Sequence, residues 1–117
     1  MSHRSAYLWL RVVELTSIPL AAFMALYVIS GYGMLAPRLT RVLGLGYRVS
    51  AYLHTNPTLR YLTSLLAALH GCGGVVLLAR RYARDPRLRW ALELLGVAYA
   101  AALVAISTAV EAALAFG

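Results

Sequence analysis

The sequence predicts an all-α integral membrane protein with three transmembrane helices and one short interfacial amphipathic helix, and three observations support this prediction. First, 62% of the 117 residues are apolar and only 13% are charged, whereas about one quarter of a soluble domain is charged. Second, three uncharged stretches reach the length of about 20 residues that a helix needs to cross a bilayer. Third, all eleven basic residues are arginines that border these stretches. We therefore expect a single transmembrane domain over residues 1–117, surrounded by lipid.

The composition also excludes several classes of protein. Disorder requires low hydrophobicity, and the mean hydropathy here is +0.72. Cys72 is the single cysteine, so a disulfide scaffold is ruled out. We expect Cys72 to be a small buried apolar residue. A net charge of +7 would suit nucleic acid, but the arginines are dispersed between apolar stretches, so no nucleic-acid partner is expected. No Ser-His-Asp set, carboxylate pair or phosphate-binding loop is evident for hydrolysis or group transfer.

The first span is expected over residues 8–35, with no charge from Leu15 to Pro37. Pro19 lies inside it, where a proline frees a carbonyl one turn back and permits a kink that neighbouring helices can satisfy. The run is too long for a cleavable signal and lacks a small-residue cleavage site, so we expect this helix to be retained.

Residues 38–53 are too charged to span and are expected to form the interfacial helix. On a helical wheel Arg38, Arg41 and Arg48 share one side, which would face lipid phosphate. The other side is apolar and contains Leu39, Val42, Leu43, Val49 and Leu53. The Asn-Pro pair at 56–57 ends the segment, because the residue before proline avoids the helical region.

The second span is expected over residues 60–80 and the third over 90–116, with a turn at 85–86 that starts the third helix. The third helix has small residues at intervals of about one turn, which let helix backbones approach closely. They are Ala98, Ala101, Ala105, Ala109 and Ala112. This face is expected to pack on another helix, within the chain or in another chain.

The distribution of arginine predicts the orientation. Seven lie on the side of the N-terminus and the second loop: Arg4, Arg11, Arg80, Arg81, Arg84, Arg87 and Arg89. Four lie on the other side: Arg38, Arg41, Arg48 and Arg60. The positive-inside rule then favours a cytoplasmic N-terminus and an external C-terminus, and we expect the plasma membrane of a prokaryote.

His70 is the main candidate for chemistry. It is the midpoint of the uncharged run from Tyr61 to Ala79, and ionisable groups at that depth usually mark function or a paired interior contact. Neutral imidazole is a common ligand of haem iron. The glycines at 71, 73 and 74 remove side-chain bulk where a macrocycle would approach the backbone. Alternatively, His70 bonds a Ser, Thr or Tyr of a neighbouring helix and the glycines serve close packing.

His54 is the second candidate ligand. In one straight helix it would lie about 24 Å from His70, too far for both to bind one iron. Either the chain folds back after Pro57, or each histidine has a different partner. A partner could be His70 of a second copy, a histidine of another subunit, or Met24 or Met34. Alternatively, His54 is an interfacial residue near lipid headgroups.

Two arginines flank the second span and could pair with haem propionates or an anionic quinone headgroup. Arg60 lies at one end and Arg81 at the other. Alternatively, both mark the basic border of a transmembrane helix and extend to the interface. His3 is expected to have no role.

The membrane-border acids are expected to pair within their own helices. Glu14 follows Arg11 by three residues, and Glu93 follows Arg89 by four. Glu111 has no such neighbour and is expected to reach the external interface.

The run Leu69–Gly74, followed by an apolar stretch and a basic loop, resembles the second helix of the small cytochrome b anchors of succinate dehydrogenase and fumarate reductase. In that family a haem-ligating histidine is followed four residues later by glycine, as His70 is by Gly74, in a three-span subunit of similar length. The resemblance implies haem b at His70, quinone as a substrate, and a respiratory complex with other membrane subunits and a peripheral redox subunit.

Two other functions remain open. The chain could be a non-catalytic membrane subunit whose helices stabilise a larger assembly. A glutamate at the start of the first span, Glu14, is also similar to the membrane carboxylate of small multidrug-resistance transporters, which exchange protons for cationic drugs. Those transporters have four spans, whereas three are predicted here.

Overall fold

The computed structural model describes residues 3–117, which form helices and short connections without a strand. The helices are α1 (His3–Leu35), α2 (Pro37–Thr40), the 3-10 helix η1 (Arg41–Leu43), α3 (Tyr47–Thr55), α4 (Pro57–Tyr82) and α5 (Pro86–Phe116). Three of them, α1, α4 and α5, are long and apolar enough to cross a membrane. These are the three helices that the sequence predicts, each extended by a few residues beyond its expected bounds.

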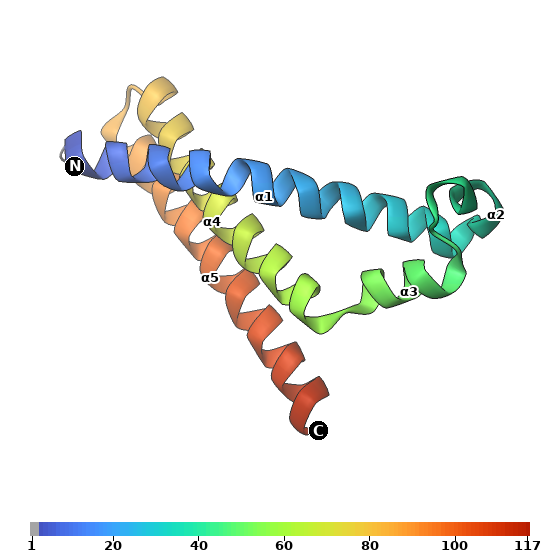
Figure 1. Cartoon of the computed structure of the whole chain (residues 1–117). Helices are drawn as coiled ribbons and strands as arrows, with labels where there is room; N and C mark the ends of the chain where they lie inside the picture. The colour runs from blue at the N-terminus through green and yellow to red at the C-terminus, as the bar shows by residue number, and fades with distance from the viewer. Residues whose placement is uncertain (1–2) are drawn as a thin grey trace.

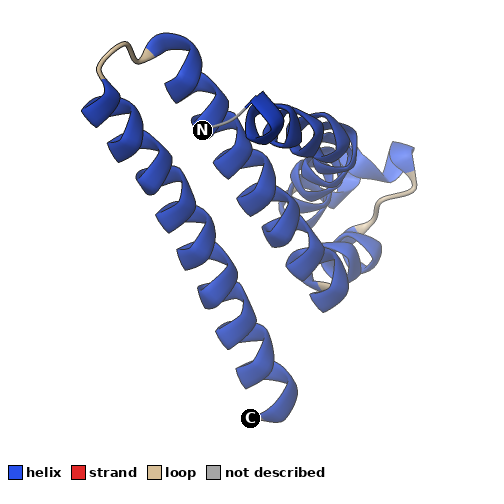
Figure 2. Ribbon diagram, turned by 90° about the vertical axis from the view of Figure 1, so that its left-hand side faces the viewer, coloured by secondary structure: helices blue, strands red, loops and turns tan. Residues whose placement is uncertain are grey.

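Helix α4 is the central element of the fold. It packs against α1 on one side and α5 on the other, whereas α1 and α5 make almost no contact with each other (Figures 1 and 2). The buried apolar side chains accordingly belong to α4 and the residue just after it: Ala68, Cys72, Val76, Ala79 and Ala83. Cys72 is therefore a small buried residue, as expected.

The segment predicted as one interfacial helix is divided into two short helical pieces that turn back on α1 (Figure 1). The break lies at Gly44, whose φ of 75° is in the left-handed region that favours glycine. Thr40 closes the turn, because its hydroxyl donates to the Leu45 carbonyl at 2.6 Å. Helix α3 then packs along the C-terminal half of α1, where Ser50 is fully buried. A Cβ atom at Gly33 would lie 1.9 Å from Ser50 Oγ, so this approach requires glycine.

The starts of α4 and α5 have the same local chemistry. Asn56 accepts a hydrogen bond from the Leu59 amide and precedes Pro57, while Asp85 accepts from the Arg87 amide and precedes Pro86. A side-chain acceptor at the cap followed by proline at the first helical position satisfies the orphan amides of a helix start. The predicted boundaries at both proline pairs are confirmed.

Two ion pairs join α4 to α5, one near each end of the pair of helices. Arg60 binds Glu111 through two parallel hydrogen bonds, and Arg80 Nε donates to Glu93 at 3.0 Å. The two arginines are separated by about 30 Å along α4 at the standard helical rise, which equals the thickness of a bilayer core. The ion pairs thus fix the antiparallel register of α4 and α5.

These pairs correct two expectations about the acids. Glu111 does have a partner, and Glu93 pairs with Arg80, not with Arg89 of its own helix. Arg89 instead donates to the Ala83 carbonyl at 2.9 Å. Spacing along one helix could not reveal partners that the antiparallel packing of two helices supplies.

Adjacent glycines of α4 provide a test of the packing. A Cβ atom at Gly73 would lie 2.8 Å from Val13 and 3.3 Å from Trp9 on α1, whereas one at Gly74 would meet no atom within 4 Å. We expect Gly73→Ala to lower the free energy of unfolding by about 1–3 kcal/mol, as overpacking does. Gly74→Ala should leave it unchanged or raise it, since alanine favours helix. Thermal unfolding of both variants in detergent measures the difference, and equal effects would contradict this packing.

Candidate functional site

His70 lies in the middle of α4 and faces α1. Its Nδ1 is 3.1 Å from the hydroxyl oxygen of Thr16, one of the few buried polar residues. The contact with a hydroxyl of a neighbouring helix, which the sequence left as one alternative, is thus present. A contact through Nδ1 does not occupy the second ring nitrogen.

The hydroxyl of Thr16 also contacts its own helix. Its oxygen is 2.7 Å from the Val12 carbonyl and 3.3 Å from the Val13 carbonyl. When the hydroxyl donates to Val12, Thr16 accepts from the Nδ1–H of His70. In that neutral tautomer Nε2 has the lone pair with which histidine binds metals. Within residues 3–117 no hydrogen bond engages Nε2.

The three glycines after His70 have different surroundings. Gly71 is covered by α5, since a Cβ atom there would lie 3.1 Å from the Tyr99 ring, and Gly73 is covered by α1. Gly74 follows His70 by one turn on the same face, and a Cβ atom there would meet open space. Packing therefore explains Gly71 and Gly73, and Gly74 alone leaves room beside the histidine.

His54, at the end of α3, repeats the arrangement on another part of α1. Its Nδ1 is 3.0 Å from the hydroxyl of Ser30, which in turn donates to the Tyr27 carbonyl at 3.2 Å. The Tyr27 ring packs edge-on against the imidazole, with ring centroids 5.2 Å apart. When Ser30 donates to Tyr27 and accepts from the Nδ1–H of His54, the neutral imidazole has its acceptor at Nε2.

The two histidines do not converge on one site. Their hydroxyl partners, Thr16 and Ser30, lie on one face of α1 and are separated by about 21 Å at the helical rise. The chain does not fold back after Pro57. Instead, α3 and α4 pack against α1 one after the other along its length (Figure 1). The sequence left open whether the chain folds back to bring the two histidines together or whether each histidine has a different partner. The structure has the second arrangement, with Thr16 beside His70 and Ser30 beside His54.

His54 forms one wall of a groove of about 510 Å³ along α1. The other lining residues are Tyr27, Val28, Gly31, Tyr32, Met34 and Leu35. The groove thus brings Met34, a candidate second ligand, to His54. Met24 lies outside it and is half exposed.

The two candidate arginines are not beside His70. The guanidinium of Arg60 binds Glu111 and also donates to the Thr55 carbonyl at 3.2 Å, so it joins three helices. The guanidinium of Arg81 lies 5.3 Å from the ring centroid of Tyr82 and is exposed. Structural contacts therefore account for Arg60, and Arg81 is part of a basic helix end.

The remaining acids and metal-binding groups are dispersed. Glu14 pairs with Arg11 at 2.8 Å, as expected, and both side chains are about half exposed. Among residues 3–117, no three His, Cys, Asp or Glu side chains gather into a metal site. Each histidine could thus serve only a metal that brings most of its own ligands.

The small-residue face of α5 points away from the rest of the fold. Ala98, Ala101, Ala105, Ala109 and Ala112 are all exposed, and α5 contacts α4 through the opposite side, which includes the buried Gly96. A Cβ atom at Gly96 would lie 3.1 Å from Val75. The expectation that the alanine face packs within the chain is therefore wrong, and only packing against another chain or lipid remains.

No protein-family model matches the chain, and no curated protein or solved structure shows significant similarity to it.

Proposed function

We propose that this protein is an integral membrane subunit that binds haem b through His70 and transfers electrons between a partner protein and quinone. We place it in a prokaryotic plasma membrane with a cytoplasmic N-terminus, in a respiratory complex with other membrane subunits and a peripheral redox subunit. The observation that supports it most is the contact of His70 with Thr16 through Nδ1, which leaves Nε2 without a hydrogen bond among residues 3–117.

The depth of His70 supports the proposal. It lies halfway between Arg60 and Arg80, about 15 Å from each along α4, and therefore near the centre of a bilayer that the two ion pairs border. A histidine with an unused electron pair at that depth is costly unless something binds it. A hydrogen bond from Nδ1–H to Thr16 is the kind of contact that fixes the orientation of a metal-bound imidazole.

The space beside His70 also fits a flat macrocycle. Gly74 keeps the face next to the imidazole clear, and the porphyrin supplies four ligands, so the protein needs to provide only one or two. The group, when bound, supplies one-electron redox chemistry. Because His54 of the same chain is too distant, a second protein ligand would come from a second copy or another subunit.

The visible spectrum of the wild-type protein tests the proposal. Protein purified from haem-replete cells should show a sharp Soret band and split α and β bands after reduction with dithionite. A preparation without haem bands that gains none after addition of haemin and removal of the excess would refute haem binding.

Quinone is assigned to the groove beside His54. The acceptor Nε2 suits a hydroxyl donor, and a hydroquinone headgroup provides one together with a flat ring that can pack between Tyr27, Tyr32 and Met34. This assignment takes the neutral tautomer in which Ser30 accepts from Nδ1–H and Nε2 is the acceptor.

Two substitutions at His54 test this assignment. Asparagine keeps an N–H near the position of Nδ1 for Ser30 but has no acceptor at Nε2, and we expect about tenfold weaker binding of menadiol from the loss of one hydrogen bond. Glutamine places its amide oxygen near Nε2 and should retain most of the affinity. Equilibrium dialysis in detergent measures both, and equal affinities would contradict the assignment.

The alanine face of α5 favours a second candidate, a non-catalytic subunit that stabilises a larger assembly. It presents five small residues away from α4, and such faces support close helix association in membranes. In that case Ala105→Leu would disrupt the assembly, His70→Ala would not, and no chromophore would be present.

A further inference from the structure

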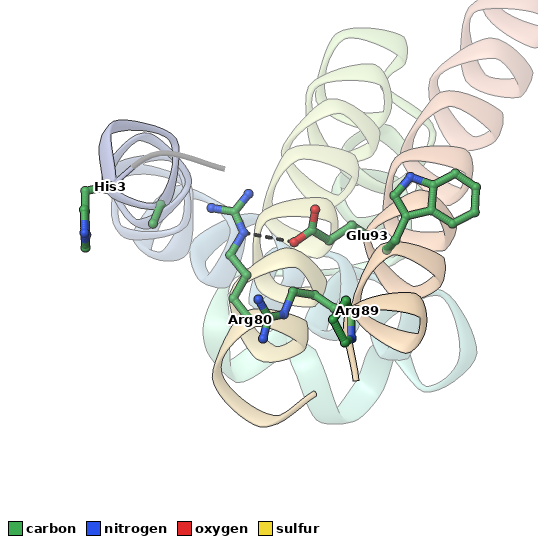
Figure 3. Close-up of a pocket in the computed structure, with 7 residues that line it drawn as sticks. His3, Arg80, Arg89 and Glu93 are labelled. Carbon is green, nitrogen blue, oxygen red and sulfur yellow. Dashed lines mark hydrogen bonds and ion pairs between the residues drawn. The ribbon is translucent and has the colours of Figure 1, made fainter. Parts of the chain in front are cut away.

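The first parts of α1 and α5 and the end of α4 enclose a cavity of about 350 Å³ (Figure 3). Its lining includes His3 and Ala6 of α1, Arg80 of α4, and Arg89, Trp90 and Glu93 of α5. All three long helices contribute to it, although α1 and α5 make almost no other contact. The cavity therefore lies where a ligand could join α1 to α5.

The charges of the cavity are not balanced. Arg80 and Glu93 neutralise each other at 3.0 Å, and their side chains are only 15% and 18% exposed. Arg89 donates through Nε and Nη2 to the Ala83 carbonyl, a neutral acceptor, and no carboxylate lies within ion-pair distance of it in residues 3–117. A single positive charge with an unused Nη1 thus remains at the cavity wall.

The surroundings add positive charge. The same end of the molecule contains Arg4, Arg81, Arg84 and Arg87, and the acid nearest in sequence, Asp85, is used to cap α5. Trp90 lies at the rim and is 66% exposed. A tryptophan beside arginines at the end of apolar helices is typical of the membrane interface.

We propose that this cavity binds the phosphate of an anionic phospholipid headgroup, with Arg89 as the principal contact. Guanidinium groups bind phosphate through paired, charge-assisted hydrogen bonds. Basic pockets between transmembrane helices on the cytoplasmic side are where anionic headgroups bind, and the distribution of arginine predicts that this end is cytoplasmic. The proposal requires that the helices span a membrane, but it is independent of haem and of quinone.

Native mass spectrometry of the whole chain in neutral detergent tests the site. We expect one phosphatidylglycerol to bind per chain at least tenfold more tightly than phosphatidylcholine with the same acyl chains. Arg89→Gln should weaken phosphatidylglycerol binding about tenfold, because it removes a charge-assisted hydrogen bond. Arg38→Gln is the matched control, because it removes an exposed arginine that would face lipid phosphate at the other border, outside this cavity. Its effect on phosphatidylglycerol binding should be much smaller than that of Arg89→Gln.

Three further measurements make the test decisive. Arg89→Lys keeps the charge and should retain part of the affinity, which separates charge from loss of the Ala83 contact. Circular dichroism of each variant without lipid shows whether the fold is intact. Equal binding of both lipids, equal effects of Arg89→Gln and Arg38→Gln, or inorganic phosphate that displaces the lipid at micromolar concentration would each overturn the assignment to a lipid headgroup.

Discussion

Replacing His70 by alanine is expected to abolish the reduced Soret and α bands of the purified protein. The imidazole is the proposed iron ligand, and His54, which also contacts α1, is held by Ser30 and not by Thr16. The substitution would leave a cavity in place of the imidazole. The other candidate histidine, His54, contacts Ser30, which lies about 21 Å from Thr16 along α1. Absorption spectra of membranes and of purified protein, normalised to protein content, measure the loss.

Two control variants show whether the loss is specific. Thr16→Val removes the hydrogen bond that orients the ring but keeps the ligand, so we expect haem affinity to fall by about 10–100-fold without complete loss. His54→Ala should leave the bands unchanged. A His70→Ala protein with bands at the wild-type positions would show that another residue binds the haem.

Breaking the Arg60–Glu111 pair is expected to destabilise the protein. In Glu111→Leu the guanidinium of Arg60 loses two of its hydrogen bonds at the packed α4–α5 surface, and we expect the free energy of unfolding to fall clearly. The fall is moderated by solvent, because the Arg60 side chain is 36% exposed. Unfolding in mixed micelles of increasing denaturing-detergent content measures it.

A double variant and an exposed pair serve as controls. Replacing both partners, in Arg60→Leu with Glu111→Leu, should recover most of the loss, because no unpaired charge remains. In contrast, Glu14→Gln breaks a pair that is about half exposed on both sides and should change stability by less than about 1 kcal/mol. If the double variant is as unstable as the single one, the penalty is not due to the unpaired arginine.

The three long helices could be predicted because their evidence is local. Each is an uncharged run bordered by arginine, and the Asn-Pro and Asp-Pro pairs at 56–57 and 85–86 mark two helix starts. The division of the 38–53 segment also has a local signal in Gly44 and Gly46, which interrupt an apolar pattern that is otherwise continuous on one surface. The left-handed turn at Gly44 ends that continuity.

The partners across helices could not be predicted, because they depend on register. Thr16 and Ser30 are ordinary residues of an apolar helix until α4 and α3 place a histidine against each. Gly73 and Gly74 are equivalent in the sequence, and only the approach of Trp9 and Val13 separates them. Likewise, nothing in the local spacing connects Glu111 to Arg60, 51 residues away.

The two ion pairs bear on how a chain with three helices long and apolar enough to cross a membrane would enter a bilayer. Both arginines belong to α4 and both glutamates to α5, and only three residues, 83–85, separate these helices. A hairpin that inserts as one unit presents each pair to the lipid as a neutral group, which is far cheaper than transferring four separate charges. Helix α1 contributes the Ser5 hydroxyl, which lies 3.4 Å from Arg80, so docking of α1 on an α4–α5 hairpin would complete the surroundings of that pair.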